Sequence, residues 1–228
     1  MKSFFSTIFF DFDYTLADSS RGAVDCINYA LTNLGLPAVP DSDACQTIGL
    51  SLSDTFTHLT GNSSTTQHKE FIRLFTQRAD QIMADSTVLF ESVPETLAML
   101  KKQGITLGIV STKFHYRIEA ILNRENLLHA FDIIVGSEDV SKHKPDPEGL
   151  LKALEMTQSS PSGTVYVGDS VVDAETAKRA GVSFIAVLSG TTLKDAFKGY
   201  EVYGFADCFQ DIIELTYTES KTIAQPHN

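Results

Sequence analysis

The chain has 228 residues, of which 43% are hydrophobic and 21% charged, which suits a folded protein with one large core or one core and a smaller module. Its 14 glycines and 7 prolines exclude collagen-like and low-complexity classes. Eighteen Lys and Arg face 29 Asp and Glu, a formal net charge of −11, so we expect no nucleic-acid partner and no binding to an anionic membrane.

The first predicted strand, Ser6–Asp11, is separated from the next by residues 12–104. The later strands are continuous apolar runs that end in small or acidic residues, typical of a parallel sheet buried on both faces: Ile105–Ser111, Phe131–Gly136, Thr164–Asp169 and Ser183–Leu188. Helical patterns accompany them: Pro94–Lys102, Tyr116–Asn126, Pro147–Met156 and Val171–Ala180. This alternation predicts an α/β fold with a Rossmann-like parallel sheet flanked by helices.

The long segment after the first strand is far longer than an ordinary crossover. Amphipathic helical spacing recurs within it, at Ala23–Leu34, Asp54–Leu59 and Lys69–Met83. We therefore predict a helical cap domain over residues 17–86, inserted into a core domain formed by residues 1–16 and 87–228.

The apolar stretch at residues 4–10 ends at Asp11, and it is too short for a signal peptide or a membrane span. The three cysteines, Cys26, Cys45 and Cys208, have no zinc-type spacing, and their odd number does not indicate a disulfide framework. We expect them to be small buried side chains of a cytoplasmic protein.

Polar residues gather where the predicted strands end, and ligands of open parallel sheets bind at the carboxyl ends of the strands. Asp11, Asp13 and Thr15 follow the first strand, and Ser111, Thr112 and Lys113 follow the second. Lys144 precedes the fourth strand, which ends in Asp169 with Asp173 on the following turn.

These residue types suit one reaction. Asp11, Asp13 and Asp169 would repel one another without a cation, and oxygen ligands with open water positions are what Mg²⁺ prefers. Ser111, with backbone N–H groups at a helix start, and Lys144 would supply donors and charge for a tetrahedral anion such as phosphate. Together they indicate phosphoryl transfer through an aspartyl-phosphate.

Four motifs carry a resemblance to a known family. They are Asp11-Phe-Asp-Tyr-Thr-Leu-Ala-Asp18, Ser111, Lys144 within Lys-Pro-Asp-Pro, and Gly168-Asp-Ser-Val-Val-Asp173, with the helical insertion between the first two. In this order they resemble the haloacid dehalogenase-like hydrolases, in the subgroup of phosphoglycolate phosphatases and β-phosphoglucomutases. The resemblance covers the whole chain.

The resemblance implies roles for the acidic residues. Asp11 would be the nucleophile that attacks phosphorus, and it would also bind the metal ion. Asp13 would be the general acid and then the general base, while its backbone carbonyl binds Mg²⁺. Asp169 would bind Mg²⁺ through its side chain, and Asp173 would hold a metal-bound water or orient the site.

The resemblance also implies which groups bind the phosphate and what class of substrate the enzyme uses. Ser111 and the Thr112 amide would hold the phosphoryl oxygens, with Thr15 in the same set. Lys144 would neutralise charge on nucleophile and phosphate, and Lys113 would contact the substrate or the cap. The expected partner is a small phosphorylated metabolite, with phosphoglycolate the nearest family substrate, and the enzyme would be a monomer or a homodimer.

Alternative activities remain open. Mutases of the subgroup carry His where this chain has Ala23, which favours a hydrolase over a sugar-phosphate mutase. A pyrophosphatase is a further alternative. The dehalogenase branch does not need Asp13 or Mg²⁺, and phospho-accepting receiver modules lack a helical insertion after their first strand, so the sequence disfavours both.

Simpler structural roles compete with some of these assignments. Asp173 could be an ordinary first-turn carboxylate of a helix, and Ser111 an N-cap. Lys113 and Arg117 would usually be solvated surface charges. Tyr14 stands where most family members have Gly. The loop at residues 50–52, after Gly49, is expected to face the site.

Overall fold

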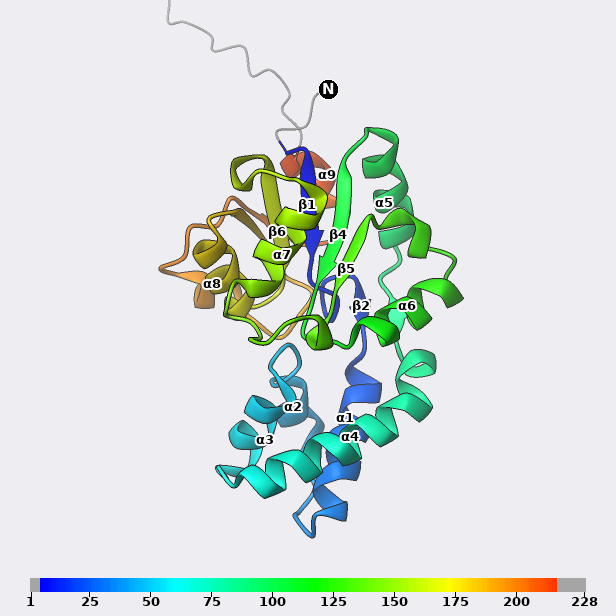
Figure 1. Ribbon diagram of the computed structural model, residues 1–228, viewed down its shortest axis with the longest axis vertical. Coiled ribbons are helices and arrows are strands. Elements are labelled where there is room, and N and C mark those ends of the chain that lie inside the picture. The colour runs from blue at the N-terminus through cyan, green and yellow to red at the C-terminus, as the bar shows by residue number, and fades with distance from the viewer. Residues whose placement is uncertain (1–4, 217–228) are drawn as a thin grey trace, which may run out of the picture.

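The computed structural model describes residues 5–216, and it centres on a six-stranded parallel sheet (Figure 1). The strand order is β5-β4-β1-β6-β7-β8. The strands span Thr7–Phe10 (β1), Thr106–Val110 (β4), Ile133–Val135 (β5), Thr164–Gly168 (β6), Ser183–Val187 (β7) and Gly204–Ala206 (β8). The predicted α/β class is confirmed.

Helices cover both faces of the sheet because side chains along each strand alternate between two cores. Ile8 and Phe10 of β1 pack in a core with α5 (Val93–Lys102), α6 (His115–Arg124) and α9 (Asp211–Thr216). Phe9 packs in the opposite core with α7 (Glu148–Thr157) and α8 (Val171–Ala180). Short 3-10 turns lie between the elements, at Leu128–Ala130, Ser137–Asp139, Pro161–Gly163 and Lys194–Phe197.

The inserted segment forms a separate group of helices at the end of the sheet where β1 ends (Figure 1). These helices are α1 (Ser20–Asn33), α2 (Asp41–Cys45), α3 (Leu52–Thr60) and α4 (Thr65–Ser86). They have their own core, which includes Ile27, Leu31, Phe56 and Phe71. The chain passes from the core into the cap at β2 (Ala17–Asp18) and returns at β3 (Val88–Leu89). These two short strands pair in an antiparallel ribbon.

The five predicted strands and seven predicted helices are all present, with bounds that shift by a few residues. The sequence did not predict β2, β3, β8, α2 and α9. Each has only two to six residues, too few for a hydrophobic period to show. None of the helices within residues 5–216 is long and apolar enough to cross a membrane.

Candidate active site

Three neighbouring strands bring the candidate residues to one edge of the sheet. β1 pairs with β4 on one side and with β6 on the other, and Phe10 lies level with Ile109 and Val167. Asp11, Ser111 and Asp169 are the residues that follow directly after these strands. The parallel register therefore places the three side chains at the same end of the sheet.

Lys144 lies in the middle of this group as a buried cation. Its Nζ is 2.9 Å from Asp11 Oδ1 and 2.6 Å from Asp173 Oδ1. The hydroxyl of Tyr166, 3.3 Å from the same Nζ, also lies 2.7 Å from the Val110 carbonyl oxygen. Burial alone would lower the pKa of Lys144, but the Asp11 and Asp173 carboxylates outweigh it and raise that pKa, so the ammonium stays charged.

Asp173 both caps the start of α8 and forms an ion pair with Lys144. Its Oδ2 accepts hydrogen bonds from the Ser170 backbone N–H (3.1 Å) and hydroxyl (2.6 Å), a capping box at the start of α8. Its Oδ1 pairs with Lys144. Because both oxygens already have partners within the chain, Asp173 is better suited to orient Lys144 than to bind a metal ion directly.

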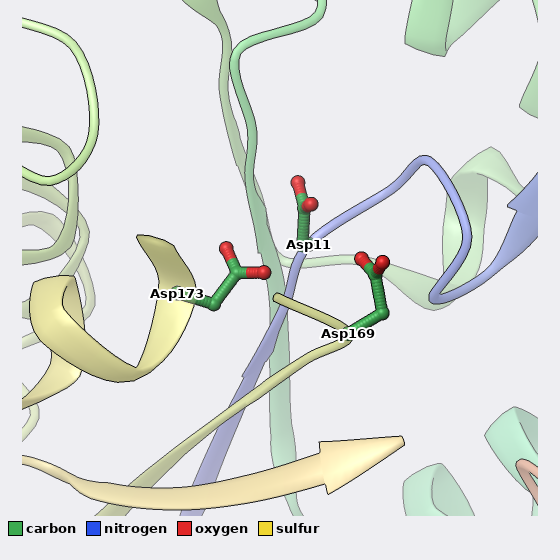
Figure 2. Close-up of side chains that lie close together, drawn as sticks. All are labelled: Asp11, Asp169 and Asp173. Atoms are coloured by element: carbon green, nitrogen blue, oxygen red, sulfur yellow. The ribbon is translucent and has the colours of Figure 1, made fainter. Parts of the chain in front are cut away.

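Carboxylate oxygens of Asp11, Asp169 and Asp173 lie within 4.8 Å of one another, and all three residues are buried (Figure 2). They come from the end of β1, the end of β6 and the first turn of α8. Gly190 keeps room for Asp169, since a Cβ at that position would lie 2.0 Å from Asp169 Oδ2. Asp11 Oδ1, although near Lys144, has no well-formed hydrogen bond.

Burial dominates the acidity of this cluster. It raises the pKa of Asp11 to about 6, against the lowering effect of the Lys144 ammonium. Burial, with the nearby charges of Asp173 and Asp11, raises the pKa of Asp169 well above its usual range. A cation placed among these oxygens would relieve both effects, so the donor set fits a hard divalent ion such as Mg²⁺.

Asp13 lines a cavity that it shares with residues of the cap. Its Oδ1 accepts hydrogen bonds from Ser19 Oγ (2.5 Å) and Lys113 Nζ (2.8 Å). The side chains of Lys113 and Asp13 are 6% and 12% exposed, so this is a buried ion pair. The simpler alternative, in which Lys113 is a solvated surface charge, is wrong, because a carboxylate from the β1 loop neutralises it inside the protein.

The hydroxyl residues of the site are also enclosed. Ser111 is 7% exposed, and its Oγ accepts a hydrogen bond from the Lys113 backbone N–H (3.3 Å). The Ser111 side chain also forms a hydrogen bond with the Asp11 carboxyl group, which lowers the pKa of that group and so opposes the effect of burial. Thr15 is fully buried, and its Oγ1 has no hydrogen-bond partner among the described residues.

Arg117 is a second cation that we expected on the surface and that the structure places inside. It is 5% exposed and lies on α6 of the core. Its Nη2 donates to Asp80 Oδ1 (2.7 Å) and to the Thr76 carbonyl (3.1 Å), both on α4 of the cap. Tyr116 donates to the same carboxylate (2.6 Å). Arg117 therefore ties the core to the cap.

A cavity of about 70 Å³ lies between cap and core beside Asp13, Thr112 and Lys113. Gly49, Leu50 and Leu52 line it, and the Thr112 hydroxyl donates to the Gly49 carbonyl (3.2 Å). The expectation that this cap loop faces the site is confirmed.

The three cysteines were expected to be buried. Only Cys26 is buried, whereas Cys45 is half-buried and Cys208 is exposed, so the expectation holds for one of the three.

Comparison with known proteins identifies the fold family. The family model for haloacid dehalogenase-like hydrolases matches residues 8–187. The chain is 32% identical over 196 residues to pyrophosphatase PpaX of Bacillus mycoides, covering 85% of this chain and 89% of that protein.

Solved structures agree with this match. A crystal structure described as a haloacid dehalogenase-like hydrolase from Bacteroides fragilis superposes with a TM-score of 0.89 at 43% identity, covering 91% of this chain and 99% of that one. A predicted phosphoglycolate phosphatase from Haemophilus somnus has a TM-score of 0.82 at 26% identity, with 94% and 99% covered. The chain therefore belongs to the haloacid dehalogenase-like hydrolases, as a phosphatase of the phosphoglycolate phosphatase-like subgroup.

Proposed function

We propose that the enzyme is a Mg²⁺-dependent phosphatase that hydrolyses a small phosphomonoester through a phosphoryl group carried on Asp11. The buried arrangement of Asp11, Asp169 and Lys144 carries this proposal. It combines a carboxylate nucleophile, an oxygen donor set and a fixed cation at the carboxyl ends of adjacent strands.

Asp11 suits the nucleophile because it is ionised near neutral pH and held in place. Its pKa of about 6 leaves the carboxylate charged at pH 7, and its backbone N–H donates to the Val167 carbonyl (2.9 Å). Lys144 neutralises part of the charge of the nucleophile, which allows a phosphate dianion to approach it. Asp173, through its ion pair, keeps Lys144 at that position.

Asp11, Asp169 and the backbone carbonyl of Asp13 would hold the metal ion, with Asp173 near but occupied by its own hydrogen bonds. When bound there, Mg²⁺ supplies positive charge that offsets the phosphoryl oxygens and the carboxylates. Ser111, the Thr112 amide and Thr15 would bind the phosphoryl oxygens. The unpaired buried hydroxyl of Thr15 is consistent with such a ligand.

Asp13 would then transfer protons on the leaving-group side. It stands two residues after the nucleophile and faces the cavity under the cap. From there it would protonate the leaving oxygen and later take a proton from the attacking water. Thr112 and Lys113 line the same cavity.

A mutase is the less favoured alternative. Ala23, which replaces the His of the family's mutases, lines the cavity beside Asp13 and brings no proton-transferring group to it. The names of the relatives point to pyrophosphate and phosphoglycolate as compounds to test. The residues that would bind the phosphoryl group do not discriminate between pyrophosphate and phosphoglycolate.

Release of inorganic phosphate tests the proposal. The panel contains acetyl phosphate, phosphoglycolate, pyrophosphate and a sugar phosphate, each with Mg²⁺ and with EDTA. We expect release that requires Mg²⁺ and is lost in Asp11→Asn while the variant remains folded. A folded Asp11→Asn protein with full turnover would contradict it, and net isomerisation of the sugar phosphate would favour the mutase.

A further inference from the structure

The cavity under the cap is where the leaving part of a substrate would lie, because Asp13, the proposed proton donor, forms part of its wall. Its volume of about 70 Å³ has room for about five to seven water-sized groups, at roughly 10–15 Å³ each. A leaving group of only a few heavy atoms fits this space. The chemistry of the walls then indicates what that group is.

The cap side of the cavity is mainly hydrocarbon. Its wall includes Ile27, Leu50, Leu52, Phe75 and Met83. Among the residues of the described chain that line the cavity, those from the cap carry no charge. A carboxylate, a second phosphate or a polyol would therefore lose water against this wall without gaining a charged partner from it.

The hydroxyl groups around the cavity are already engaged as donors. Each gives its hydrogen to another group of the chain: Ser19 to Asp13 (2.5 Å), Thr47 to the Ala44 carbonyl (2.8 Å), Thr55 to the Thr47 carbonyl (3.4 Å) and Thr112 to the Gly49 carbonyl (3.2 Å). Binding a second anion through these hydroxyls would require breaking one of these bonds.

The two cations of the cavity wall come from the core, and both are paired. Lys113 Nζ lies 2.8 Å from Asp13, and Arg117 Nη2 lies 2.7 Å from Asp80. Both cationic side chains are 6% exposed, whereas their partners Asp13 and Asp80 are 12% and 48% exposed, so a second anion would have to compete with a carboxylate that is already paired with a buried cation. The wall is therefore electrically balanced before any substrate enters.

We infer that the leaving part of the substrate is a compact, uncharged hydrocarbon group. The preferred substrates are small alkyl phosphomonoesters, ahead of esters whose leaving part carries a second anionic group, such as phosphoglycolate, and of polyhydroxylated sugar phosphates. This inference rests on the proposed phosphatase activity and specifies its substrate class. The hydrocarbon wall selects the alkyl group, while Asp11, Lys144 and Ser111 bind the phosphoryl group common to all these esters.

Isobutyl phosphate and phosphoglycolate form a matched pair for the test, because their leaving parts have the same branching and nearly the same size but differ by one charge. The measurement is kcat/KM for each ester with Mg²⁺, with acetyl phosphate as a reference. Leu50→Lys places a cation in the half-buried cap wall, and Met156→Lys adds the same charge at a site on α7 that is 62% exposed.

We expect isobutyl phosphate to exceed phosphoglycolate at least tenfold in kcat/KM. Leu50→Lys should reduce this ratio at least tenfold, whereas Met156→Lys should leave it unchanged. A ratio of one or less in the unmodified enzyme would overturn the inference while the phosphatase stands. The same holds for a ratio that Leu50→Lys does not change, or one that Met156→Lys reduces as much as Leu50→Lys does. Failure to hydrolyse any of these compounds, acetyl phosphate included, would overturn the proposed function and the inference with it.

Discussion

Lys113 and Asp13 form an ion pair of 2.8 Å that joins the loops after β4 and β1 beneath the cap. Both residues line the cavity in which we place the leaving group. The two residues are 100 positions apart in sequence. The ion pair links the proposed proton donor to the loop that carries Ser111.

Replacing Lys113 by Met should destabilise the protein by about 3 kcal/mol, because it leaves the Asp13 carboxylate buried without its partner. Turnover should also fall, since Asp13 loses the contact that orients it. Urea unfolding and kcat measure the two effects. In the Asp13→Asn/Lys113→Met double variant we expect a smaller loss of stability than the sum of the single variants. Additive losses would show that the two side chains do not interact in solution.

Tyr14 has a left-handed backbone conformation, with φ of 59°, and its ring is only 7% exposed. Loss of a buried ring costs about 3–5 kcal/mol, whereas relief of the backbone conformation returns about 1–2 kcal/mol. Tyr14→Gly should therefore destabilise the enzyme, and Tyr14→Ala should destabilise it by about 1 kcal/mol more, because Ala loses the ring and keeps the strain. Thermal or urea unfolding gives the order, and a Gly variant less stable than the Ala variant would contradict the strained conformation.

Asp173 should be more sensitive to substitution than its helix-capping role alone requires. Asp173→Asn removes the charge that pairs with Lys144 (2.6 Å), so we expect kcat to fall by about two orders of magnitude. Ser170→Ala removes the N-cap hydroxyl and should cost about 1 kcal/mol of stability with less than a tenfold change in kcat. If the two variants lose stability alike and keep similar turnover, Asp173 is a helix cap only.

The strand ends were predictable from the sequence because apolar runs define strands locally, and parallel pairing then brings Asp11, Ser111 and Asp169 together. The burial of Lys113 and Arg117 was not predictable. Their partners Asp13 and Asp80 are 100 and 37 residues away, and no local period connects them. Strand β8, with three residues at the sheet edge, was likewise too short to recognise.

The acidic cluster gives the metal-free protein an unusual dependence of stability on pH. The pKa of Asp11 is about 6 in the folded protein against an ordinary value of 3.8, so the folded state binds the proton more tightly than the unfolded state. Between these two values the folded state holds more protons, and the free energy of unfolding falls as pH rises. The raised pKa of Asp169 acts in the same direction. With EDTA present, this cluster should therefore stabilise the protein less at pH 8 than at pH 5.

Asp11→Asn tests this cause, because it removes the buried charge and keeps the shape of the side chain. At pH 8 in EDTA the variant should melt about 3 °C or more above the unmodified protein, since 1 kcal/mol corresponds to roughly 2–4 °C in a chain of this size. At pH 5 the difference should shrink. Mg²⁺ should stabilise the unmodified protein more at pH 8 than at pH 5, because the ion competes with protons for the carboxylates. Equal melting temperatures of the two proteins at pH 8 in EDTA would show that the Asp11 charge is not a source of instability.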